Sequence, residues 1–217
     1  MITNHNQYLD IAFQIAEKNL GKTHQNPSVG CVVVKNGTVI SSGVTSKNGR
    51  PHSEFNALSK LKKCSGATLY TTLEPCTHRG KTPPCVDIIV KKKIKKVFYA
   101  FEDPDLRTFK KSKKILNFNG VRSKLIPSKK YKKFYKSYFY NKKKFRSYVS
   151  AKIAVSKDYK TINTKNKWIT NKNSRKIVHL LRSQYDCIIS TSRSINYDNA
   201  KLNCRIRGLD SNKPDLF

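Results

Sequence analysis

Hydrophobic and polar positions recur with two different periods along the first two thirds of the chain. Apolar residues spaced three and four apart predict helices at 5–20, 52–61, 84–92 and 108–118. Short runs of β-branched and aromatic residues predict strands at 29–34, 38–41, 67–73, 97–101 and 121–126. Asn36-Gly37 joins the first two strands in a tight hairpin. Helices that alternate with strands indicate an α/β sandwich layered around one sheet.

The pattern changes after Ile126. In 127–146, lysines alternate with tyrosines and phenylalanines, which could form a surface on which nucleic-acid bases stack. A lysine-rich helix with inward-packed aromatics, followed by a linker, is the favoured interpretation. A second unit then begins, with predicted strands at Tyr148–Val155 and Cys187–Ser190 and a helix at 171–183 between them.

Composition narrows the class of protein. The 217 residues are 37% hydrophobic and 10% aromatic, enough for a buried core, so wholesale disorder is not expected. No apolar run is long enough to span a membrane, and Met1–Asp10 has no signal-peptide core. Six cysteines without a secretory signal indicate reduced thiols or metal ligands. We therefore expect a cytoplasmic protein.

The formal charge of +32, from 45 Lys and Arg against 13 Asp and Glu, has two interpretations. Lys, Asn, Ile, Tyr and Phe are the residues that AT-rich codons encode, and the lysines lie along the whole chain. Compositional drift of a solvated surface is therefore favoured over selected polyanion binding. We expect no specific nucleic-acid partner, only nonspecific attraction of RNA at low salt.

Four residues carry the chemistry. His52, Cys76 and Cys85 offer the imidazole and two thiolates of a zinc site whose fourth position stays open for water. Zinc lowers the pKa of such a water toward ~7. Glu54, two positions after His52, could take the water proton and deliver it to a departing amine. His-x-Glu followed by Pro-Cys and a second Cys is typical of zinc nucleobase deaminases.

The spacing of the cysteines is unusual. Eight residues, Thr77–Pro84, separate them where two are common. If this segment loops out, Arg79, Lys81 and Thr82 would lie at the rim of the pocket and could hold a phosphate; the alternative is that they are ordinary exposed residues. We expect His78 to contact substrate or solvent rather than to be a fourth ligand.

Three segments closely resemble the bifunctional riboflavin-biosynthesis deaminase/reductase family: Asn26–Val34, Pro51–Leu58 and Thr72–Cys85, which includes the long insert. The resemblance implies a cytidine-deaminase-like three-layer α/β/α sandwich over 1–145. The implied reaction is deamination of 2,5-diamino-6-ribosylamino-4(3H)-pyrimidinone 5′-phosphate, with release of ammonia. It implies that zinc binds the His/Cys/Cys set and that Glu54 moves the protons. The implied substrate contacts are Asn26, His78, Arg79, Lys81 and Thr82.

The region 146–217 resembles the start of the same family's reductase, which implies the N-terminal fragment of a dihydrofolate-reductase-like α/β domain. That domain uses NADPH to reduce the ribosyl group to ribityl. The implied cofactor contacts are Val155, Trp168, Ser194 and Asp198. The implied substrate contacts are Asn166, Arg182, Leu202 and Arg205. Because the family's domain continues for well over a hundred residues more, we expect a working deaminase with a lost or incomplete reductase.

Several positions depart from the family pattern. Ser53 replaces an alanine, a change expected to be harmless, and Lys110 and Ser112 replace glycines. Two alternatives remain: a transfer-RNA adenosine deaminase, which keeps two residues between its cysteines, and a basic scaffold protein without catalysis. The expected partner is a small phosphorylated pyrimidine, and a homo-oligomer is possible.

Overall fold

The computed structural model of the chain describes residues 4–161, 168–210 and 214–217. It divides into two compact units, Met1–Tyr148 and Val149–Phe217. The boundary predicted from the sequence lies three residues before this division. Each unit is described by itself.

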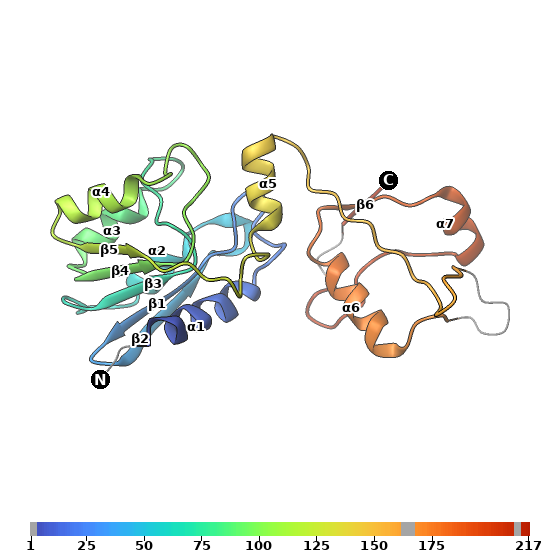
Figure 1. Cartoon of the computed structure of the whole chain (residues 1–217), viewed down its shortest axis with the longest axis horizontal. Coiled ribbons are helices and arrows are strands. Elements are labelled where there is room, and N and C mark those ends of the chain that lie inside the picture. The colour runs from blue at the N-terminus through green and yellow to red at the C-terminus, as the bar shows by residue number, and fades with distance from the viewer. Residues whose placement is uncertain (1–3, 162–167, 211–213) are drawn as a thin grey trace. The chain divides into compact units, whose positions relative to one another are not determined.

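The first unit is built on a five-stranded sheet (Figure 1). Its strands are β1 (Gly30–Lys35), β2 (Thr38–Val44), β3 (Thr68–Thr71), β4 (Lys96–Tyr99) and β5 (Arg122–Leu125). They lie in the order β2-β1-β3-β4-β5. The strand β1 is antiparallel to both of its neighbours, whereas β3, β4 and β5 are parallel. The carboxyl ends of β3 and β4 therefore open at the same edge of the sheet.

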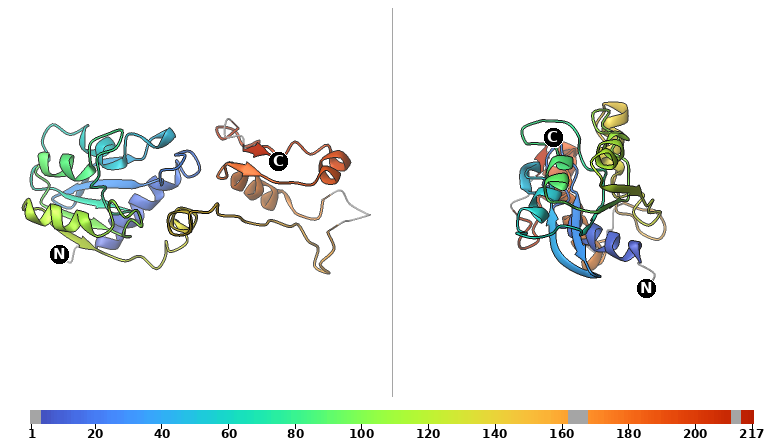
Figure 2. Two further views of the ribbon diagram at one scale, coloured as in Figure 1. Left: turned by 90° about the horizontal axis from the view of Figure 1, so that it is seen from above. Right: turned by 90° about the vertical axis from the view of Figure 1, so that its left-hand side faces the viewer.

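Helices cover both faces of this sheet (Figures 1 and 2). The helix α1 (His5–Glu17) lies on one face. On the other lie α2 (Ser53–Leu58), α3 (Cys85–Lys91) and α4 (Lys111–Phe118). A short 3-10 turn, η1 (Lys47–Gly49), precedes α2, and α5 (Lys136–Lys144) ends the unit. The three-layer α/β/α sandwich expected from the sequence is what forms.

The core follows the twofold period of the strands. On β1, Cys31 and Val33 pack with α2, α3 and α4, whereas Val32 and Val34 pack toward α1. Both faces of this strand are covered, which is why it is a continuous apolar run rather than an alternating one. The same alternation places Leu69 on one side of β3 and Tyr70 on the other.

Two glycines let the helices approach the sheet closely. A Cβ on Gly30 would lie 1.8 Å from the carbonyl oxygen of Ala12 in α1, and one on Gly43 would lie 2.3 Å from that of Ser53 in α2. No side chain fits at either point, so α1 and α2 rest directly on backbone. The hairpin turn is also as predicted: Asn36 and Gly37 both have positive φ, 51° and 78°, as its tight geometry requires.

Most aromatic residues of 127–146 pack against the core: Tyr131, Phe134, Tyr135, Tyr138 and Phe139. Tyr140 and Phe145 are exposed, at 40% and 87%. Tyr135 is 3% exposed, and its hydroxyl donates to the carbonyl of Ser28 and lies 2.6 Å from the Thr72 hydroxyl. The Tyr131 ring stacks on Phe13 of α1 at 3.8 Å between centroids. The packed aromatics extend the core beneath α1, so the inward-packed interpretation is confirmed for them.

Helix ends differ from the sequence prediction by a few residues. The helix α1 ends at Glu17, α2 ends at Leu58, and α4 begins only at Lys111. The late start of α4 has a local cause, since Lys110 adopts a left-handed conformation with φ 58°. Leu9 and Phe13 are the most buried large residues of α1.

The second unit contains α6 (Lys172–Arg182), β6 (Cys187–Ile188), α7 (Ser192–Asp198) and β7 (Asp215–Leu216), with β6 and β7 parallel. The predicted strand Tyr148–Val155 is wrong: this segment has no regular structure, and Val149 and Ile153 are 79% and 73% exposed. Apolar alternation forms a strand only where a neighbouring strand pairs with its backbone. Among the described residues of this unit, only Ser183 and Cys204 are buried.

Within the described part of the chain, no helix has the length and apolar character needed to cross a bilayer.

Candidate metal and catalytic site

His52, Cys76 and Cys85 converge at the sheet edge where β3 ends. Their ligand atoms all lie within 4.8 Å of one another. The Nδ1 atom of His52 is 3.3 Å from Cys85 Sγ and 3.5 Å from Cys76 Sγ. An imidazole and two thiols are the donor set that zinc prefers, and three of them leave a fourth position open. The residues present therefore fit a catalytic zinc site.

Three separate elements deliver these side chains. His52 is the residue before α2, which Gly43 allows to sit directly on the sheet. Cys76 follows the end of β3, and Cys85 is the first residue of α3. The backbone amide of Cys85 donates to Cys76 Sγ at 3.3 Å, and the amide of Val86 donates to the Cys76 carbonyl. The start of α3 is thus tied to the other cysteine despite the long insert.

The pKa values of the Cys76 and Cys85 thiols are shifted in opposite directions. A hydrogen bond from Cys85, together with His52, lowers the pKa of the Cys76 thiol to about 4. The same pairing with Cys76, added to burial, raises the pKa of Cys85. Burial acts to lower the pKa of His52, but its hydrogen bond with Cys76 and the charge of Glu54 outweigh burial and raise it. A thiolate therefore forms readily here, and a cation would be attracted to the cluster.

Glu54 lies in the first turn of α2 and is 3% exposed. Burial raises the pKa of its carboxyl group, and the negative charge of Cys76 raises it further. The Ser53 hydroxyl donates to Glu54 Oε2 at 2.9 Å. Sequence reasoning treated Ser53 as a neutral replacement of alanine and missed this bond. A buried carboxyl group with a raised pKa, beside a metal site, is suited to accept and return a proton.

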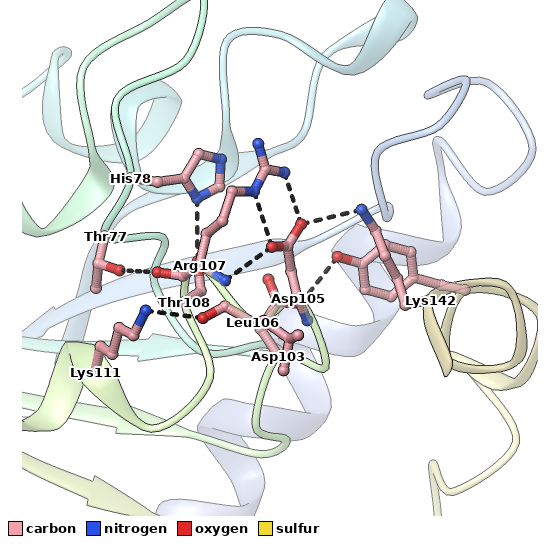
Figure 3. A network of polar contacts seen from close by, with 10 residues as sticks. Thr77, His78, Asp103, Asp105, Leu106, Arg107, Thr108, Lys111 and Lys142 are labelled. Carbon is pink, nitrogen blue, oxygen red and sulfur yellow. Dashed lines mark hydrogen bonds and ion pairs between the residues drawn. The ribbon is translucent and has the colours of Figure 1, made fainter. Parts of the chain in front are cut away.

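The segment between the cysteines loops out over the site. Thr77 donates to the carbonyl of Arg107 at 2.8 Å, and His78 Nδ1 lies 3.3 Å from the Thr108 hydroxyl (Figure 3). Burial lowers the pKa of His78, and the charge of Arg107 adds to this. At the far end of the loop, the Arg50 guanidinium donates to the Thr82 hydroxyl. Arg50 and Arg107 are rim residues that sequence reasoning did not single out.

The other predicted substrate contacts are distributed along this rim. Arg79 and Lys81 are exposed, and Thr82 is half-buried. Asn26 is half-buried and donates to the carbonyl of Gly49 at 3.3 Å, in the turn before His52. The structure brings these residues to the loops around the His/Cys/Cys cluster, and their contact with substrate stays a prediction.

Glu74 organises the opposite side of the site. It is 3% exposed, and its carboxylate accepts hydrogen bonds from the amides of Asp103, Lys110 and Ser112 at 3.1–3.2 Å. The Ser112 hydroxyl donates to it as well, at 2.9 Å. One buried carboxylate thus holds both ends of the segment Asp103–Ser112, which contacts Thr77 and His78. Sequence reasoning used Glu74 only as part of the Glu-Pro-Cys motif.

We expect Glu74→Gln to lower the free energy of unfolding by about 2 kcal/mol, because an amide in this place turns an NH₂ group toward buried donors. Urea unfolding of the mutant and wild-type proteins measures the change. Glu17→Gln, at an exposed position of α1, is the matched control and should change stability by less than about 0.5 kcal/mol. Equal stability of all three proteins would show that the Glu74 network does not hold this segment.

The positions predicted for the reductase lie in the second unit, and their role in a reductase site stays a prediction. Val155 and Trp168 are 39% and 55% exposed, and the Ser194 amide donates to the Thr191 side chain, which caps the start of α7. Arg182 donates to the carbonyl of Asn203, and Arg205 donates to the Asn203 side chain. Leu202 has φ 47°. Asn166 lies outside the described residues; Asp198 ends α7.

Comparison with known proteins shows which ones this chain resembles. Residues 2–101 match the model of the cytidine and deoxycytidylate deaminase zinc-binding region. The riboflavin biosynthesis protein RibD of Aquifex aeolicus is 37% identical over 91% of this chain and 57% of its own length. That of Escherichia coli is 31% identical over 97% of this chain and 58% of its own length. The structure of Acinetobacter baumannii RibD superposes with a TM-score of 0.86 at 32% identity, over 98% of this chain and 62% of that protein.

This chain is similar to RibD proteins over nearly the whole of its own length. Its first unit has the cytidine-deaminase-like fold, and zinc is the metal that suits its His/Cys/Cys cluster. A deaminase/reductase of Thermotoga maritima superposes over 94% of this chain with a TM-score of 0.83, so the similarity extends into both units. The chain spans somewhat more than half the length of the RibD relatives it matches. The dihydrofolate-reductase-like assignment of the second unit stays a prediction.

Proposed function

We propose that the first unit deaminates 2,5-diamino-6-ribosylamino-4(3H)-pyrimidinone 5′-phosphate by hydrolysis, in riboflavin biosynthesis. The observation that carries this proposal is the buried carboxyl group of Glu54 beside three zinc-type donors within 4.8 Å of one another. The RibD relatives are named as riboflavin biosynthesis proteins, which supports the choice of pathway and substrate. Six free cysteines suit a reducing compartment, so we place the enzyme in the cytoplasm.

The roles of the site residues follow from their positions. His52, Cys76 and Cys85 would hold zinc, which when bound acts as a Lewis acid and lowers the pKa of a water molecule. Glu54 would accept a proton from water at its carboxylate as the water oxygen bonds to the ring carbon. It would then pass that proton to the amino group, which leaves as ammonia when the C–N bond breaks. Ser53 keeps the carboxylate oriented by its hydrogen bond. The buried setting of Glu54 limits loss of the proton to solvent.

A transfer-RNA adenosine deaminase would use the same chemistry, but two features of this chain disfavour it. Eight residues lie between Cys76 and Cys85. Most aromatics of 127–146, which could have stacked on bases, pack against the core. We therefore propose that the substrate is a small phosphorylated pyrimidine, contacted by Asn26 and by the loop residues His78, Arg79, Lys81 and Thr82.

The deciding experiment is mass spectrometry of the products formed from the diaminopyrimidinone ribosyl phosphate by zinc-loaded protein with NADPH present. A deaminated product that retains ribose supports the proposed deaminase without reductase activity. A deaminated ribityl product would show that the second unit takes part in a complete NADPH-dependent reductase. Absence of any product would overturn the proposed function.

Removal of residues 149–217 should leave the rate of ammonia release within about threefold of the full-length rate. The first unit has its own sheet and core, and every residue of the proposed zinc and proton-transfer site lies in it. Ammonia release by the two proteins, each checked for zinc content and for cooperative unfolding, measures the effect. A folded, zinc-loaded first unit without activity would show that the second unit supports the site.

A further inference from the structure

The segment Asp103–Ser112, here called the 103–112 loop, lies against the zinc-site loop at the residue next to a metal ligand. Thr77 directly follows Cys76, and its hydroxyl donates a hydrogen bond to the Arg107 carbonyl at 2.8 Å. His78 Nδ1 lies 3.3 Å from the hydroxyl of Thr108, which is fully buried. Figure 3 shows the Arg107 guanidinium beside the His78 imidazole. Arg107 is therefore a residue of the site's rim.

The guanidinium of Arg107 is held in one orientation. Its Nε donates to Asp105 Oδ1 at 2.9 Å, and its Nη2 donates to Asp105 Oδ2 at 2.7 Å. Asp105 is 10% exposed at its side chain, whereas the Arg107 side chain is 60% exposed. This two-point contact uses one side of the planar fork. The Nη1 hydrogens and the second Nη2 hydrogen remain for another acceptor.

The helix α5 fixes this pair from behind. Lys142 of α5 donates to Asp105 Oδ2 at 3.0 Å, and Tyr138, one turn earlier, donates to Asp103 Oδ1 at 2.9 Å. Asp103 in turn accepts from the Asp105 amide at 3.0 Å. Two cations, Arg107 and Lys142, thus meet the carboxylates of Asp103 and Asp105, and the carboxylates are buried while the Arg107 side chain is 60% exposed. The charged group of this network that faces solvent most is therefore the Arg107 guanidinium. Such a cation attracts an anionic group.

We propose that Arg107 is a specificity-determining residue that recognises the phosphate monoester of the substrate. The inference rests on the proposed function, because it assumes a phosphorylated substrate at the zinc site. A pre-oriented guanidinium presents paired donors that match phosphate oxygens. By contrast, Arg79 and Lys81, the cations predicted from the sequence, are exposed, and among the described residues no hydrogen bond or ion pair orients either side chain. Arg107 is thus the better-organised cation of the rim.

The test compares substrates with and without the phosphate. The phosphate preference is the ratio of kcat/KM for the phosphorylated substrate to kcat/KM for its dephosphorylated nucleoside. In Arg107→Gln this ratio should fall about 10- to 100-fold, the loss expected for a charge-assisted contact. Lys113→Gln removes an equal charge from an exposed position of α4 and should leave the ratio unchanged. An unchanged ratio in Arg107→Gln, with both activities lowered in proportion or not at all, would overturn the proposal.

Two further measurements separate this inference from other failures. Arg107→Lys keeps the charge but not the fork, so it should recover part of the phosphate preference if Arg107→Gln folds poorly. Calorimetric titration with ribose 5-phosphate reports on the rim without catalysis. Wild-type binding that Arg107→Gln weakens about tenfold supports the inference even if the wild type deaminates neither substrate, a result that would overturn only the proposed function. Equal affinity of both proteins for ribose 5-phosphate counts against Arg107.

Discussion

Glu54→Gln should lower the rate of ammonia release at least about 10³-fold while the protein keeps its zinc, within the range found for loss of a general acid–base group. Glutamine has almost the same shape and accepts the Ser53 hydrogen bond, so the fold and the three metal donors stay in place. It has no carboxylate oxygen to take the proton from water, and no acid form to return it to the amine. Ammonia release and zinc content, measured on the same preparation, check the prediction.

A graded control sharpens this result. Ser53→Ala removes the hydroxyl that orients the Glu54 carboxylate but leaves the carboxyl group itself. We expect this mutant to lose less than about tenfold in rate, consistent with one hydrogen bond of about 1 kcal/mol. If Glu54→Gln turned over at near the wild-type rate with zinc bound, the proton must travel by another group and the mechanism would fail.

The layers of the fold and the metal donors were predictable because their signals are local in the chain. The apolar run Val32–Val34 indicates a strand covered on both faces, and Asn36-Gly37 indicates the turn after it. The donors stand in short motifs whose order predicts convergence. The spacing of apolar residues did not predict where helices end, as the start of α4 at Lys111 shows.

The hydrogen-bond network around the site was not predictable, because its partners are far apart in sequence. Glu74 accepts from Ser112, 38 positions later, and Asp105 is held by Lys142, 37 positions later. No spacing rule links such pairs. Lys110 and Ser112, which replace glycines of the family pattern, also have contacts that only the structure reveals. Lys110 keeps a left-handed backbone, and Ser112 donates to Glu74, so the 103–112 loop is held at both replaced positions.

The missed prediction in the second unit has the opposite origin. Tyr148–Val155 has the composition of a strand, but the structure gives it no strand partner and leaves Val149 and Ile153 exposed. Strand propensity is a property of a residue on a paired, half-buried surface, so it fails where no such surface is present. The described part of this unit buries only two residues. This core is too small to hold the segment Tyr148–Val155 in a regular structure.

Cys85→Ser should reduce zinc from one ion per chain to a small fraction and remove the activity with it. A serine hydroxyl stays protonated at neutral pH and is a poor ligand for zinc, whereas a thiolate is a strong one. Changes of residues that merely support ligands typically weaken metal binding by about 10- to 100-fold, so loss of a ligand should exceed about 100-fold. Zinc content after dialysis against buffered free zinc measures the change.

The same mutation should separate the stabilising effect of the metal from that of the thiol. A ligand present at about a thousand times its dissociation constant stabilises the fold by about 4 kcal/mol, so a chelator should lower the melting temperature of the wild-type protein. It should have no such effect on Cys85→Ser. The control is Cys64→Ser, which changes another buried cysteine that lies outside the cluster and contacts the Lys92 carbonyl. That mutant should keep its zinc and its response to chelator; equimolar zinc in Cys85→Ser would instead exclude Cys85 as a ligand.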